Sequence, residues 1–174
     1  ATMMQSFAIT CIVTLVWVVA GYSIAFTNGN AFIGDFSRIM LKGIGDGISK
    51  GGDVPFLLGA GSPAEAQQTI SESLYMMYQM TFAIITPALI CGAFADRMKF
   101  SALCIFISLW SLLIYSPVAH WVWAPTGWAS VAGVLDFAGG TVVHINAGIA
   151  GLVCCLVLGK RQGYGTTNMS PHNL

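Results

Sequence analysis

Long stretches without a charged side chain constrain the fold of this 174-residue chain more than any other feature. Four windows contain no Asp, Glu, Lys or Arg: residues 3–26, 73–95, 100–135 and 137–159. A transmembrane helix needs about 20 predominantly apolar residues, so each window is long enough to cross a bilayer. We therefore expect an all-α membrane protein, a polytopic helical bundle with four transmembrane helices in the lipid bilayer.

The composition argues against the soluble classes of protein. Charged residues make up 8% of the chain, whereas an average soluble domain has about 25%. Ordinary soluble enzymes need more charge than this, so an enzyme is not expected. The net charge is zero, which leaves no basic stripe for a nucleic-acid partner.

All five cysteines fall within apolar stretches, where cysteine acts as a small hydrophobe. We expect no disulfide, no metal site and no cofactor.

Turn signals place the ends of the spans within a single transmembrane domain. The predicted helices cover residues 3–26, 70–95, 98–123 and 137–159. The third charge-free window is longer than one helix, but the Ala-Pro-Thr-Gly sequence at 124–127 ends that span.

Basic residues in the connections predict the orientation of the bundle. The loop between spans three and four has no Lys or Arg, whereas the two connections on the other side carry Arg97, Lys99, Lys160 and Arg161. By the positive-inside rule these cations mark the cytoplasmic side. The segment at 27–69 is then an extracellular loop, because long loops translocate largely regardless of their charge.

The start of the chain and the surface of the fourth span favour a fragment of a larger bundle over a complete four-helix protein. Residue 1 is Ala rather than Met, and the first span begins almost at once. The fourth span has small residues on more than one side, namely Gly140, Ala147, Gly148, Ala150 and Gly151. Small residues let transmembrane helices approach closely, so we expect further helices to pack there.

His144 is the first candidate for function, because polar side chains at membrane depth are costly and usually have a role. It lies a few residues into the fourth span, between Val143 and Ile145. A neutral imidazole offers one hydrogen-bond donor and one acceptor. Such a ring can bind a small polar guest or relay a proton. It can equally form a structural hydrogen bond to a neighbouring helix, and its position leaves the functional and the structural role open.

Asp136 is the second candidate and precedes the fourth span. An Asp at this place can accept hydrogen bonds from the free N–H groups of the first helical turn, where the helix dipole also favours a negative charge. The following Gly139 and Gly140 let another backbone approach closely, and Thr141 comes next. A structural cap is favoured over direct binding of a cation, although a carboxylate here also attracts cations to the outer mouth.

Aromatic residues form two groups at the predicted outer ends of the second and third spans. The group on the third span consists of His120, Trp121, Trp123 and Trp128. The group on the second span follows the i, i+3, i+4, i+7 spacing of one helix face and consists of Tyr75, Tyr78, Gln79 and Phe82. Interfacial tryptophans usually anchor a helix in the membrane. A cation can also bind over aromatic faces, with about 0.5–2 kcal/mol for each contact.

The sequence from Asp136 to Gly148, DFAGGTVVHINAG, resembles the signature of the ammonium transporter family (Amt/Mep/Rh). Flanking segments agree with it: QMTFAIIT at 79–86, PVAHWVW at 117–123, GKR at 159–161 and PHNL at 171–174. The similarity runs through essentially the whole chain. The outer Trp123 makes it more similar to the bacterial Amt branch than to the Rh branch.

The resemblance implies a fold and a function. Members of the family have eleven transmembrane helices, in two inverted five-helix halves plus a last helix, and this chain resembles helices two to five. The implied activity is transport of ammonium or ammonia, with methylammonium as an analogue. The implied setting is a multi-pass protein of the cell membrane that forms a homotrimer, with a PII-type regulatory protein as a partner on the cytoplasmic face.

The resemblance also implies roles for individual residues. Phe82 and Trp123 match the aromatic pair of the outer ammonium recruitment site, and Phe82 also matches the outer member of the phenylalanine gate. Gln79 lies where the family often has a polar residue beside the vestibule. Asp136 matches the acidic residue that holds the outer vestibule together, and His144 matches the first of the two pore histidines.

Two other classes of function are compatible with individual residues. A b-type haem electron-transfer membrane subunit would use His120 and His144 as axial ligands. A membrane sensor or scaffold without transport activity would need a signalling domain, which these 174 residues do not contain. Neither class accounts for the signature around His144.

Overall fold

A computed structural model of the chain describes residues 2–44, 55–57, 67–95 and 97–170. Within these residues, four helical segments are long and apolar enough to cross a membrane, namely Met3–Phe26, Glu72–Phe94, Phe100–Val131 and Gly140–Leu158. The predicted fold class, a polytopic helical membrane bundle, is confirmed.

π-Helical turns occur within the first, third and fourth of these segments. The first consists of α1 (Thr2–Val16), η1 (Trp17–Gly21) and α2 (Tyr22–Phe26). The third consists of α5 (Phe100–Trp110), η4 (Ser111–Tyr115) and α6 (Ser116–Trp123), followed after a turn by the short α7 (Trp128–Val131). The fourth consists of η5 (Gly140–Ile145) and α8 (Asn146–Leu158). Hydrogen bonds in a π-turn reach one residue further than in an α-helix, so the helix is locally wider.

The second segment is a single helix, α4 (Glu72–Phe94), and its start is capped. The Ser71 hydroxyl accepts a hydrogen bond from the backbone N–H of Leu74 at 3.4 Å. Glu72 places a carboxylate in the first turn, where the positive end of the helix dipole favours it. Both features fix the place at which the chain enters the bundle.

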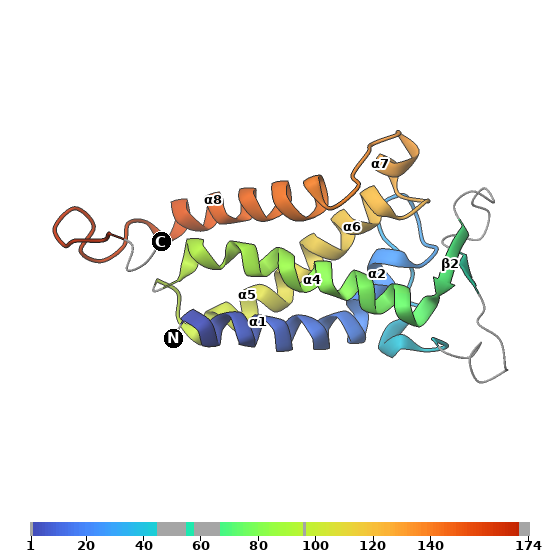
Figure 1. Cartoon of the computed structure of the whole chain (residues 1–174), viewed down its shortest axis with the longest axis horizontal. Coiled ribbons are helices and arrows are strands. Elements are labelled where there is room, and N and C mark those ends of the chain that lie inside the picture. The colour runs from blue at the N-terminus through green and yellow to red at the C-terminus, as the bar shows by residue number, and fades with distance from the viewer. Residues whose placement is uncertain (1, 45–54, 58–66, 96, 171–174) are drawn as a thin grey trace.

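Helix α4 lies between α1 on one side and α8 on the other (Figure 1). Helix α5 packs against α1, and α6 packs against α2. Between the first three segments lies a buried aromatic cluster of Trp17, Tyr22, Phe26, Tyr75 and Tyr115. The opposite surface of α8 is exposed and apolar, with Ile149, Leu152 and Leu156 among its side chains.

The two ends of the bundle differ in what they carry. Both chain ends and the connection from α4 to α5 lie at one end, and α7 and the strands lie at the other (Figure 1). Strand β1 (Pro55–Leu57) pairs antiparallel with β2 (Gln67–Ser71), and a 3₁₀ turn, η2, covers Ile39–Leu41. The sequence predicted only a loop over 27–69, because strands this short show no alternating pattern. The remainder of that loop, residues 45–54 and 58–66, lies outside the described residues.

Arginine side chains join the ends of α4 and α8. The guanidinium of Arg97 donates to the backbone carbonyls of Ala93, on α4, and Gly159, just after α8. Arg161 donates to the carbonyl of Gly92 at 3.2 Å. Carbonyls at the end of a helix lack partners within the helix and lie at the negative end of its dipole, so cations stabilise both helix ends here.

Candidate functional site

A pocket of about 280 Å³ lies at the end of α4 that is nearest the strands. Six of the residues that line it matter for its chemistry: Tyr75, Tyr78, Gln79, Phe82, Trp123 and Asp136. The first four come from α4, whereas Trp123 ends α6 and Asp136 precedes η5. All six were singled out in the sequence, and they surround one cavity.

Aromatic rings form one wall of the pocket. The rings of Phe82 and Trp123 meet edge to face, with centroids 5.5 Å apart and an interplanar angle of 68°. Tyr78 continues the row, with its centroid 5.1 Å from that of Phe82. The indole N–H of Trp123 donates to the backbone carbonyl of Asp136 at 3.0 Å, which fixes the orientation of the indole.

The carboxylate of Asp136 binds the backbone at the start of the fourth span. One oxygen, Oδ1, accepts from the N–H of Gly139 at 2.7 Å. The other, Oδ2, accepts from the N–H groups of Thr141 and Val142, both at 2.9 Å. The negative charge also lies at the positive end of the helix dipole. Asp136 thus satisfies three N–H groups that would otherwise be unpaired.

Gly139 starts the π-turn that leads to His144. Its backbone carbonyl accepts from the N–H groups of both Val143 and His144, each at 2.9 Å. Its φ of 93° lies in the left-handed region, which glycine adopts without the strain that a side chain brings. A Cβ at this position would lie 2.5 Å from Cγ2 of Val143. The turn therefore requires glycine here.

The His144 side chain is exposed in this structure. It lies on η5 and is not among the residues that line the pocket. The next residues on the same side, Gly148 and Leu152, are exposed as well. The structure therefore places His144 on the open surface of the fourth span, apart from the aromatic residues.

Gln79 is a buried polar side chain of the pocket, with 7% of its surface exposed. Its amide nitrogen Nε2 donates to the Tyr75 hydroxyl at 3.3 Å. Its amide oxygen Oε1 is buried and has no hydrogen-bond partner within the described part of the chain. A buried acceptor without a donor carries a cost of about 1–3 kcal/mol.

His120 does not line the pocket, and its ring lies against the backbone at the end of the first span and just after it. The ring is fully buried, with Nδ1 3.0 Å from the carbonyl oxygen of Ala25 and Nε2 2.8 Å from that of Asn30. Both ring nitrogens therefore lie against backbone carbonyls, which leaves neither one open to iron. The haem alternative, with His120 and His144 as ligands, is not supported.

The residues after α2 are bound to the end of the third span by two more hydrogen bonds. The indole N–H of Trp121 donates to the carbonyl of Phe32 at 2.7 Å. The backbone N–H of Trp128 donates to the carbonyl of Ala31 at 3.0 Å. Together with His120 these contacts hold the segment against α6 and α7.

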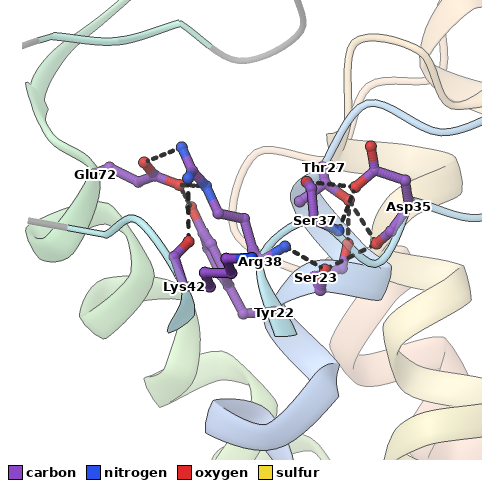
Figure 2. A network of polar contacts seen from close by, with 8 residues as sticks. All are labelled: Tyr22, Ser23, Thr27, Asp35, Ser37, Arg38, Lys42 and Glu72. Carbon is purple, nitrogen blue, oxygen red and sulfur yellow. Dashed lines mark hydrogen bonds and ion pairs between the residues drawn. The ribbon is translucent and has the colours of Figure 1, made fainter. Parts of the chain in front are cut away.

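A polar network that the sequence did not reveal joins this segment to α4 (Figure 2). Arg38 forms a two-pronged ion pair with Glu72, with Nε–Oε1 and Nη2–Oε2 distances of 2.9 and 3.0 Å. The buried Tyr22 hydroxyl donates to the same carboxylate at 3.3 Å. Arg38 and Glu72 are 34 residues apart, so only an opposite charge at each position could have suggested the pair.

The second half of the network surrounds the Asp35 carbonyl and carboxylate (Figure 2). The Ser23 hydroxyl donates to the Asp35 carbonyl at 2.8 Å, and the Thr27 hydroxyl is shared between the carbonyls of Ser23 and Asp35, at 2.6 and 2.9 Å. Ser37 donates to the carboxylate through its N–H and its hydroxyl, at 2.9 and 2.5 Å. Burial tends to raise the pKa of Asp35, but the hydrogen bonds from Ser37, together with Thr27 and the charge of Arg38, outweigh this and lower the pKa. Asp35 is therefore held as a carboxylate that stabilises the turn.

Comparison with known proteins identifies the family. The pattern of the Ammonium Transporter Family matches residues 1–174. An ammonium transporter of Bacillus subtilis (strain 168) is 49% identical over 174 residues, which are all of this chain and 39% of that protein. One of Aquifex aeolicus (strain VF5) is 46% identical over 175 residues, which are 99% of this chain and 36% of that protein.

Solved structures agree with the sequence comparison. A crystal structure of Candida albicans Mep2 has a TM-score of 0.74 at 33% identity, over 88% of this chain and 30% of that one. A crystal structure of Saccharomyces cerevisiae Mep2 has a TM-score of 0.75 at 34% identity, over 92% of this chain and 34% of that one. The chain spans about two fifths of the length of the curated relatives named above. Because the family pattern covers all 174 residues, the chain belongs to the Ammonium Transporter Family.

Proposed function

We propose that the protein carries ammonium or ammonia across the cell membrane, and that the pocket beside α4 recruits the cation. One observation carries this proposal: a single cavity is lined by Phe82, Trp123, Gln79 and Asp136. Membership of the family supports the activity, and the bacterial relatives are named ammonium transporters.

The pocket suits a small monovalent cation. The faces of Phe82 and Trp123 offer a negative electrostatic potential, and cation–π contacts contribute about 0.5–2 kcal/mol each when the cation is partly desolvated. The negative charge of Asp136 adds a longer-range attraction, although both of its oxygens already accept hydrogen bonds from the backbone. On this account Asp136 attracts the cation without binding it directly.

Beyond the pocket, ammonia is proposed to pass along His144. A bare ion is costly inside an apolar passage, whereas neutral ammonia is not. The cation is therefore proposed to lose a proton near the Phe82 gate, and ammonia then passes along His144 while the proton is returned or relayed separately. A neutral imidazole can accept or donate one hydrogen bond to ammonia, which suits this position.

The charge pattern supports an orientation for this passage. The pocket, α7 and the strands belong to the extracellular end, and Arg97, Lys99, Lys160 and Arg161 belong to the cytoplasmic end. The 174 residues then form one transmembrane domain that is part of the pore-forming unit. A homotrimer with one pore in each subunit, and a PII-type regulatory protein on the cytoplasmic face, complete the proposal.

Uptake of labelled methylammonium tests the proposed function. The protein is expressed from its complete reading frame in cells that lack their own ammonium carriers. Methylammonium should accumulate, ammonium should compete with it, and His144→Ala should change either the rate or the discrimination against potassium. Absence of uptake by well-expressed wild-type protein in the membrane would contradict the proposal. If His144→Ala leaves both the rate and the discrimination against potassium unchanged, the proposed role of His144 is wrong, and the rest of the proposal stands.

A further inference from the structure

The pocket has walls on two helices, α4 and α6, whose main packing partners are different. Tyr75, Tyr78 and Phe82 lie on α4, and Trp123 ends α6. Helix α4 packs mainly against α1 and α8, whereas α6 packs mainly against α2. Cation–π contacts act only within about 6 Å of a ring centroid. A small increase in the distance between the two walls would therefore admit water and weaken the hold on a cation.

Residues 28–38, which follow α2, form a strap that binds the outer end of α6. The Asn30 carbonyl oxygen lies 2.8 Å from Nε2 of His120. The Phe32 carbonyl accepts from the indole N–H of Trp121 at 2.7 Å. His120 and Trp121 lie three and two residues before Trp123. The strap is therefore attached to the last turn of the helix that carries one wall of the pocket.

The other end of the strap is attached to α4 through the ion pair of Arg38 and Glu72 (Figure 2). The pair is two-pronged, with distances of 2.9 and 3.0 Å, and the Glu72 side chain is 14% exposed. Glu72 lies two residues after Ile70 and three before Tyr75, and both of these residues line the pocket. The ion pair therefore joins the strap to the α4 wall, between two residues of that wall.

Between its two attachments the strap is held by its own backbone and by α2. The N–H of Asn30 donates to the carbonyl of Ile33 at 2.9 Å, which closes a turn. The N–H of Gly34 donates to the carbonyl of Ile24 at 2.8 Å. A Cβ at Gly34 would lie 2.4 Å from the carbonyl oxygen of Ser23, so the strap lies directly against α2. A strap held in this way can fix the positions of both of its ends.

We propose that the strap sets the distance between the α4 and α6 walls of the pocket, with Arg38 and Glu72 as positioning residues. Neither side chain lines the pocket, so each acts through the residues beside it. This inference rests on the proposed function and adds to it the residues that hold the two walls at the spacing a cation requires.

Uptake kinetics of methylammonium, with the protein expressed from its complete reading frame, test this inference. Arg38→Ala and Glu72→Gln should each raise the KM about three- to tenfold, because the contact to one wall is weakened. The maximal rate should stay near the wild-type value, because the contacts of Asp136 and His144 are untouched. The double change should raise the KM no further than the larger single change, because both changes break the same pair.

Three further variants separate positioning from general stability. Trp121→Phe removes the hydrogen bond between the strap and α6 and should also raise the KM. Arg38→Lys keeps the charge but not the two-pronged geometry, so its KM should lie between those of wild type and Arg38→Ala. Arg97→Ala is the matched control, because Arg97 joins α4 and α8 at the opposite end of the bundle. It should lower the melting temperature and leave the KM unchanged.

The outcomes distinguish this inference from the proposed function. An unchanged KM in both Arg38→Ala and Glu72→Gln, with uptake intact, overturns the inference and leaves the proposed function standing. An equal rise of the KM in Arg97→Ala also overturns it, because the effect would then be one of general stability. If Arg38→Ala fails to reach the membrane, an unchanged KM in Glu72→Gln and Trp121→Phe overturns it. A wild-type protein without methylammonium uptake overturns both.

Discussion

At the scale of single residues, both carboxylate oxygens of Asp136 accept hydrogen bonds from the backbone. Its two oxygens accept three N–H groups at the start of the fourth span. Asparagine is a good helix cap in general, but its amide has one oxygen and one NH₂ group. With its oxygen turned toward the N–H groups of Thr141 and Val142, its NH₂ group would face the N–H donor of Gly139. A carboxylate therefore satisfies all three N–H groups, and an amide satisfies two.

We expect Asp136→Ala to destabilise the protein by about 2 kcal/mol or more, because three N–H groups lose their acceptor, and Asp136→Asn to destabilise it by less, because one does. Thermal unfolding in detergent, followed by size-exclusion chromatography, measures this. The matched control is Asp35→Asn, where one oxygen can still accept from Ser37 and the side chain is exposed. An Asp136→Asn variant that unfolds at the wild-type temperature would argue against this assignment.

The sequence was informative about these residues to different degrees. The spacing of Tyr75, Gln79 and Phe82 predicted one helix face, because a helix brings residues three and four apart together. The meeting of that face with Trp123 and Asp136 depends on how the helices pack, and only the family resemblance anticipated it. His144 was expected at membrane depth, and its exposure reflects that no described residue packs over that side of η5.

At the scale of elements, the three π-turns show what hydropathy cannot predict. Charge-free windows indicated the spans, because lipid requires apolar side chains whatever the local hydrogen-bond pattern. A π-turn changes that pattern without changing the composition, so η1, η4 and η5 left no clear signal. In η5 the turn begins at Gly139, whose carbonyl binds two successive N–H groups. Such turns often occur at functional sites.

Gly139→Ala and Gly140→Ala form a matched pair that tests this turn. Alanine at Gly139 must adopt a positive φ and place its Cβ against the buried Val143 side chain, at a total cost of about 2 kcal/mol or more. A Cβ at Gly140 would meet only the Asp136 carboxylate, at 4.0 Å. The melting temperature should therefore fall clearly in Gly139→Ala and little in Gly140→Ala. Equal effects of the two changes would contradict the assignment of the turn to Gly139.

At the scale of the whole molecule, polar contacts bind the two ends of the bundle. At one end Arg97 joins the ends of α4 and α8. At the other end Arg38 joins the segment after α2 to the first turn of α4 through Glu72 (Figure 2). The Glu72 side chain is 14% exposed, so this pair is screened less than a surface pair. The sequence could not pair these charges, because their distance depends on the packing of the first two spans.

We expect Arg38 and Glu72 to be coupled by about 1 kcal/mol, the upper end of the range for exposed pairs. The single changes Arg38→Ala and Glu72→Gln should each lower the melting temperature, and the double change should lower it by less than their sum. Thermal unfolding of the four proteins gives the coupling directly. Fully additive losses would show that the two side chains act independently.

Recruitment of ammonium by the aromatic pocket is tested by the KM for methylammonium uptake. The measurement compares wild type with Phe82→Leu, Trp123→Leu and Trp128→Leu. Loss of one cation–π contact should raise the KM about three- to thirtyfold in the first two variants. Trp128 is half-exposed, packs against Trp121 and does not line the pocket, so its removal should leave the KM near the wild-type value. An unchanged KM in both Phe82→Leu and Trp123→Leu would contradict the account.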